Sequence, residues 1–95
     1  MQVGVGTSKL AENMVLDGGY ESVLNVDYSS VAIETMKEMH RAIPQLQYRI
    51  SDCRSMPEIQ SGAFDCLLDK GTLDAMLCGH GFGENSIKYL SECFR

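Results

Sequence analysis

The chain has 95 residues, enough for a single domain with a modest core. Its formal net charge is −5 and it has no cluster of Lys and Arg, which argues against DNA or RNA as a partner. No apolar run approaches the roughly 18–20 residues that cross a bilayer, and the first residues lack the pattern of a signal peptide. We therefore expect a soluble, cytoplasmic protein that does not bind membranes.

Strands and helices are expected to alternate along the chain. Short apolar runs predict strands at 2–3, 22–27, 46–52 and 64–71. Apolar residues at helical spacing predict helices over 8–19, 31–43 and 84–94. Segments 53–63 and 72–83 are expected to be loops. This alternation is typical of a parallel sheet with right-handed crossovers, so residues 1–95 are expected to form one α/β domain.

Capping residues mark the expected helix ends. Ser8 and either Ser29 or Ser30 can cap the first two helices. Gly18-Gly19 should stop the first helix, and Pro44 the second.

Apolar positions on these helices predict which faces are buried. Met36 and Met39 of the second helix are expected to pack in the core of the domain. In the last helix, Ile87, Leu90 and Phe94 line one apolar face.

Four cysteines occur, at positions 53, 66, 78 and 93. None forms a Cys-x-x-Cys pair, so no metal site is expected. Cys53 and Cys66 lie in or beside apolar strand-like segments and are expected to be buried free thiols.

The expected strands end in glycines or in acids. The residues at these ends are Gly4 to Gly6, Asp27, Asp52, and Asp69 with Lys70. In open parallel sheets, ligands bind beyond the carboxyl ends of the strands, so these residues mark a candidate site.

The residues of this candidate site are compatible with two alternative ligands. Gly4 and Gly6, with Asp27 at close to the expected spacing of about 20 residues, suggest a dinucleotide-binding unit. That fingerprint requires Gly or Ala three residues after the second glycine, where this chain has Lys9.

The other reading is S-adenosylmethionine, which has no phosphate to cradle. Asp27 can accept hydrogen bonds from both ribose hydroxyls, and charge-assisted bonds of this kind are strong. Asp52 can accept from the adenine amine, and Tyr28 can flank the ring.

Four motifs occur in order and cover nearly the whole chain: VGVGTSKLAENM, NVDYSSVAIETM, SDCRSMP and FDCLLDKGTLDAM, with DKGTLDA the most specific run. This set resembles the class I S-adenosylmethionine-dependent methyltransferases, in the branch that includes the elongation factor 1-alpha lysine methyltransferases. The resemblance implies a Rossmann-like sheet, methyl transfer to a protein lysine, and a translation elongation factor as a possible substrate. It also implies cofactor contacts from Gly4, Gly6, Asp27, Tyr28, Asp52, Cys53 and Lys70.

No catalytic residue is assigned by the resemblance. A carboxylate such as Asp69 or Asp74 is a candidate to help remove the lysine proton. Gln2 stands where many class I enzymes have an acid that helps hold the glycine loop.

The resemblance also implies a partial sheet, with strand order 3-2-1-4 instead of 3-2-1-4-5-7-6. We therefore expect a fragment, short isoform or predicted gene product. Its fourth strand, with Phe64, Cys66, Leu67 and Leu68, would form an exposed apolar edge prone to self-association. The alternative function is a non-catalytic module that binds the cofactor or dimerises. An NAD-binding unit is the third and least favoured function.

Overall fold

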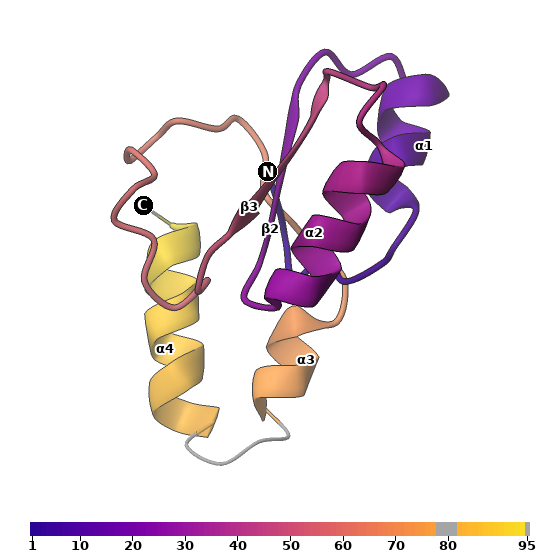
Figure 1. Cartoon of the computed structure of the whole chain (residues 1–95). Coiled ribbons are helices and arrows are strands. Elements are labelled where there is room, and N and C mark those ends of the chain that lie inside the picture. Colours follow the sequence, from indigo (N-terminus) through magenta and orange to yellow (C-terminus); the bar gives the residue numbers. More distant parts are fainter. Residues whose placement is uncertain (78–81, 95) are drawn as a thin grey trace.

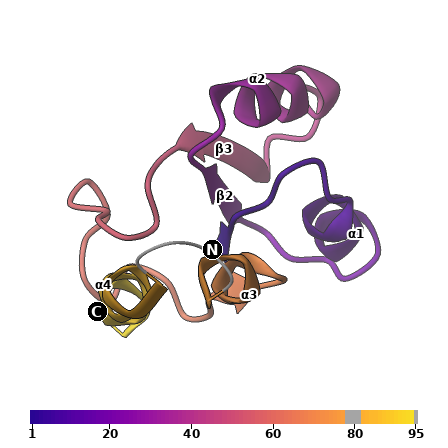
Figure 2. The same ribbon diagram turned by 90° about the horizontal axis from the view of Figure 1, so that it is seen from below.

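The computed structural model describes residues 1–77 and 82–94, which form a parallel sheet flanked by helices on both faces (Figures 1 and 2). The strands are β1 (Gln2–Val3), β2 (Val23–Asp27), β3 (Leu46–Ile50) and β4 (Leu68–Asp69). The helices are α1 (Leu10–Leu16), α2 (Ser30–Met39), α3 (Thr72–Leu77) and α4 (Phe82–Cys93).

The strand order is β3-β2-β1-β4, and every pair is parallel. Gln2 of β1 lies between Asn25 of β2 and Leu68 of β4, while Val23 of β2 pairs with Leu46 of β3. The predicted α/β class and the partial order 3-2-1-4 are confirmed.

Side chains alternate between the two faces of the sheet because successive residues of a strand point in opposite directions. On one face, Val23 of β2 packs with Ile33 and Met36 of α2. On the other face, Val26 of β2 packs with Tyr89 of α4. Figure 2 shows α1 and α2 on one side of the sheet and α3 and α4 on the other.

The predicted cap of α2 is confirmed, since the Ser29 hydroxyl accepts a hydrogen bond from the Ala32 N–H at 3.2 Å. At α1 the prediction is only partly right. The helix begins at Leu10 with Lys9 at the N-cap, and Ser8 accepts from the Leu10 N–H instead. Gly19 follows the helix with φ of +71°, a conformation that favours glycine.

The fourth strand is much shorter than the predicted 64–71, so the expected apolar edge is wrong in extent. Phe64 and Cys66 lie before β4, outside the sheet. The reason is the partner: β1 offers only two residues for pairing. One residue before β1, the Met1 amino group donates to the Cys66 carbonyl oxygen and the Met1 carbonyl oxygen accepts from the Leu68 N–H, both at 2.8 Å, so hydrogen bonds of the ladder type continue there.

The predicted loop at 72–83 is also wrong over its first part, which forms α3. Asp69 accepts hydrogen bonds from the N–H groups of Thr72 and Leu73, and so satisfies two donors at the start of this helix. The rest of the predicted loop, including Cys78, lies outside the described residues.

Two predictions of buried helix faces fail. Met36 is buried, but Met39 in the last turn of α2 is exposed. On α4, Ile87 is 68% exposed and Phe94 is 88% exposed, because the helix turns Tyr89 toward the sheet instead. A tyrosine supplies more apolar area than the isoleucine, and its hydroxyl finds an acceptor at Asp69.

Candidate functional site

A cleft of about 560 Å³ lies at the carboxyl edge of the sheet, within the 300–1,000 Å³ typical of ligand pockets. Six of the residues predicted to bind a cofactor line it: Gly4, Asp27, Tyr28, Asp52, Cys53 and Lys70. They come from segments that follow all four strands, because parallel strands end at the same edge. Gly6 does not line the cleft but contacts Asp27.

The glycine turn after β1 requires glycine at Gly4 for two reasons. Its φ is +61°, and a Cβ built there would lie 1.8 Å from the Thr72 hydroxyl oxygen. That hydroxyl donates to the Val3 carbonyl at 3.3 Å, so the start of α3 sits directly against the turn. Gly6 has φ of +51° but open space around it. Gln2 is buried in β1 and does not line the cleft.

Asp27 is fixed at the tip of β2 and is only 8% exposed. Its Oδ2 accepts from the Gly6 N–H at 2.8 Å and its Oδ1 from the Ser29 N–H at 2.9 Å. An ionised carboxylate offers about four acceptor positions. The two backbone bonds therefore orient Asp27 and leave it capacity for two further donors.

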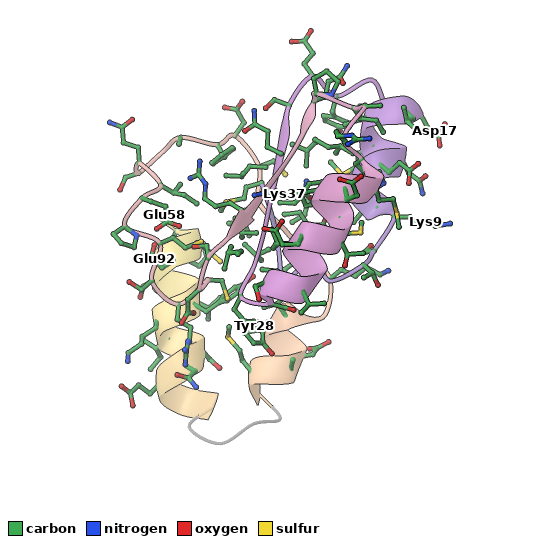
Figure 3. The ribbon with its side chains drawn as sticks, in the orientation of Figure 1. Lys9, Asp17, Tyr28, Lys37, Glu58 and Glu92 are labelled. Atoms are coloured by element: carbon green, nitrogen blue, oxygen red, sulfur yellow. The ribbon has the colours of Figure 1, made fainter. Side chains whose placement is uncertain are left out.

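Tyr28 follows Asp27 and is exposed. In Figure 3 it lies beneath the first turn of α2, beside α3. Its ring is therefore available to lie against a planar group in the cleft.

Asp52, in the loop after β3, is engaged by Arg54. The guanidinium donates from Nε at 2.9 Å and from Nη2 at 2.7 Å, and the Arg54 backbone N–H adds a bond at 2.9 Å. These hydrogen bonds lower the pKa of the Asp52 carboxyl below its usual range. Arg54 also donates to Asn85 of α4 at 3.1 Å and thereby joins two walls of the cleft.

The cysteines differ from the prediction of buried thiols. Cys53 is half-buried, and burial together with the neighbouring Asp52 carboxylate raises the pKa of its thiol to about 11. Cys66 is exposed, since the chain carries it outside the sheet. Among the described residues no cluster of three or more His, Cys, Asp or Glu could hold a metal.

The two candidate proton acceptors do not line the cleft. Asp69 accepts bonds from the N–H groups of Thr72 and Leu73 and from the Tyr89 hydroxyl. Asp74 is exposed on α3. Lys70, between Asp69 and α3, does line the cleft.

Sequence reasoning missed four polar residues of the cleft: Ser51, Arg54, Thr72 and Asn85. Arg54 stands two residues after Asp52 and Thr72 lies in the DKGTLDA run, so both stood within quoted motifs. Nothing local in the sequence marks Asn85, because only the packing of α4 brings it to the cleft.

Comparisons with known proteins agree with this geometry. The family described as "Methyltransferase domain" matches residues 1–95. Over 77 residues, 81% of this chain, the sequence is 42% identical to the EEF1A lysine methyltransferase 4 of Mus musculus. It is 41% identical over 79% of the chain to the eEF1A lysine and N-terminal methyltransferase of Homo sapiens, and 33% identical over 98% to that of Xenopus laevis.

The matched region spans 29% of the mouse relative and 11% of the human one. Among the described helices, none has the length and apolar character of a membrane span. The sheet order, the acid-tipped strands and the match over the whole chain agree, and the chain belongs to the methyltransferase domain family, as a partial Rossmann-like domain of the class I S-adenosylmethionine-dependent type.

Proposed function

We propose that this chain is the cofactor-binding part of a methyltransferase that uses S-adenosylmethionine and acts on protein lysine. The observation that carries the proposal is Asp27, held by the Gly6 N–H at the edge of a ligand-sized cleft with two acceptor positions left. Those positions suit the two hydroxyls of a ribose.

The other residues of the cleft fit the remaining parts of the cofactor. Gly4 and Gly6 keep the turn free of side chains, so the backbone can approach the ligand closely. Tyr28 offers a ring for the adenine, and Cys53 gives that end an apolar wall. Asp52 accepts from the Arg54 backbone N–H, from Nη2 and, on both oxygens, from Nε, so it can accept from the adenine amine only if Arg54 releases one of these bonds.

When bound, S-adenosylmethionine supplies a methyl group carried on a positively charged sulfur. The chain's contribution is to hold that group in line with the acceptor nitrogen, since orientation supplies much of the rate in such transfers. Asp69 and Asp74 lie outside the cleft lining, so neither is proposed as the base.

We propose a lysine of a translation elongation factor as the methyl acceptor, in the cytoplasm. The relatives that support this substrate are named as methyltransferases of eEF1A lysine.

The second candidate is a module that binds the cofactor and associates with another chain without catalysis. It is favoured by the exposed Ile87 and Leu90 on α4 and Phe94 just after it, and by the outer edge of β4, with which no strand among the described residues pairs. Exposed apolar faces and free strand edges promote association.

The test is calorimetric titration of S-adenosylmethionine into the chain and into Asp27→Asn. Loss of a hydrogen bond to a charged group predicts at least about tenfold weaker binding. Asp17→Asn, an exposed acid beyond α1 (Figure 3), is the matched control and should bind as the unaltered chain does. Unchanged affinity of Asp27→Asn, or tighter binding of NAD than of S-adenosylmethionine, would overturn the proposal.

A methylation assay with eEF1A and labelled cofactor separates the two candidates. Transfer to lysine supports the enzyme, whereas binding without transfer, together with a dimer in sedimentation, supports the module.

A further inference from the structure

We propose that Tyr89 is a positioning residue for the cleft, acting through Asp69 on the segment Lys70 to Thr72. This deepens the proposed function and rests on it for the identity of the ligand. Tyr89 itself does not line the cleft.

The first step is the contact between α4 and the end of β4. Tyr89 is only 1% exposed, and its hydroxyl donates to Asp69 Oδ2 at 2.7 Å. A bond of this length to a carboxylate is charge-assisted and among the strong ones. The acceptor lies 20 residues earlier in the chain, so this bond joins two elements that the sequence separates.

The second step is from Asp69 to the wall of the cleft. The same carboxylate accepts from the Thr72 N–H at 2.8 Å and from the Leu73 N–H at 3.1 Å. The turn that these bonds close contains Lys70, Gly71 and Thr72, and all three residues line the cleft. The intervening turn is tight, with Gly71 at φ of +96°, so its course depends on where its two ends are held.

The third step reaches the glycine turn. The Thr72 hydroxyl donates to the Val3 carbonyl and sits where a Cβ of Gly4 would be. Displacement of Thr72 would therefore change the space beside Gly4 as well as the wall formed by Lys70 to Thr72.

The sheet restrains Asp69 through a short pairing only, so the tertiary bond adds to the restraint. β4 pairs with β1 over two residues only, and Asp69 is the last of them. By contrast, Asp27 ends a strand that pairs with β3 over five residues. The Tyr89 hydroxyl replaces part of the restraint that a longer ladder would supply.

The experiment compares Tyr89→Phe with Tyr48→Phe in the full chain. Both variants remove only a hydroxyl from a buried ring. The Tyr48 hydroxyl lies 2.8 Å from His40 Nδ1, on the face of the sheet covered by α1 and α2. It does not line the cleft, so it matches the chemistry of the change without the proposed role.

Amide hydrogen exchange without ligand is the first readout. Tyr89→Phe should speed exchange of the Thr72 and Leu73 amides by about tenfold while the amides of β2 and β3 stay protected. Tyr48→Phe should leave Thr72 and Leu73 unchanged. Equal effects of the two variants at these amides would overturn the proposal, because a general loss of stability would then explain them.

Affinity for S-adenosylmethionine is the second readout. Tyr89→Phe should weaken binding about tenfold and Tyr48→Phe less than twofold. Faster local exchange with unchanged affinity would overturn the positioning role. If the unaltered chain does not bind S-adenosylmethionine, the proposed function fails, and the exchange comparison alone then decides whether Tyr89 orders this wall.

Discussion

The two halves of the sheet are held by different forces. In the first half, all five residues of β2 are buried, and α1 and α2 cover the face of the strand that bears Val23. In the second half, β4 pairs over two residues, and the outer face of α4 stays exposed. The bond from Tyr89 to Asp69 lies within that half, while packing of Tyr89 against Val26 of β2 and the hydrogen bond from Arg54 to Asn85 connect it to the rest.

The cleft lies where these halves meet, so its two walls differ in character. Asp27 stands on the half with the five-residue strand pairing, and Lys70 and Thr72 stand on the half where β4 pairs over two residues. Asp27 is buried at the end of a long strand and is held by two backbone N–H groups, whereas the segment Lys70 to Thr72 is held through the side-chain hydrogen bonds of Asp69.

Truncation of an isoleucine in each half should separate them most clearly. Ile33→Ala empties a fully buried site and should lower the free energy of unfolding by about 2–5 kcal/mol. Ile87→Ala removes an exposed side chain and should change it by less than about 0.5 kcal/mol. Urea denaturation measures both, and Ile33→Val provides a milder step if the alanine variant does not fold. A similar cost at both positions would break the comparison.

Substitutions in the glycine turn test the contact between the two halves of the sheet. Gly4→Ala combines a left-handed φ with a clash against Thr72 and should cost about 2–4 kcal/mol. Gly6→Ala has only the φ penalty, about 1–2 kcal/mol. Adding Thr72→Ala to Gly4→Ala should recover part of the loss, and no recovery would show that the clash is not the cause. Chemical denaturation of the set provides the measurement.

Alkaline pH should weaken both halves through their buried tyrosines. Burial raises the pKa of Tyr48, and burial with the Asp69 bond raises the pKa of Tyr89, above the ordinary value near 10. Above about pH 10 the unfolded chain loses these protons while the folded chain keeps them. The free energy of unfolding should then fall by about 1.4 kcal/mol per pH unit for each tyrosine until its folded pKa is reached.

Replacing each tyrosine by phenylalanine shows which half of the sheet causes the loss of stability at alkaline pH. Either Tyr48→Phe or Tyr89→Phe should flatten the slope of stability against pH between about 10 and 11, measured by urea denaturation. An unchanged slope in either variant would contradict the raised pKa of that residue.

The smallest effect is expected at the exposed ion pair on the rim. Arg54 lowers the pKa of Asp52, so Arg54→Ala should remove stability that is present above about pH 4 and lost as the pH falls through the lowered pKa. Solvent screening keeps the effect small, as it does for other exposed ion pairs. Denaturation at pH 7 and pH 3 measures it, with Arg41→Ala on exposed Arg41 as control. A loss that persists at pH 3 would point to packing of Arg54 instead.

Much of the fold, and the position at the cleft of six of the seven residues predicted to bind a cofactor, follow from the sequence alone. The apolar runs ending in Asp27 and Asp52, together with the glycine turn, predict a parallel sheet with a ligand site at one edge, because hydrophobic period and turn chemistry are local properties. The match of six predicted residues to the cleft has the same origin, since residues that follow parallel strands must meet at one edge.

Only the tertiary structure decided which face of α4 is buried and how far β4 extends. The stripe of Ile87, Leu90 and Phe94 is the most apolar by sequence, yet the helix buries Tyr89, because that hydroxyl can reach Asp69. The apolar run before β4 stays outside the sheet, because β1 offers two residues for pairing. Both outcomes depend on partners distant in sequence, and local periodicity carries no information about where such partners lie.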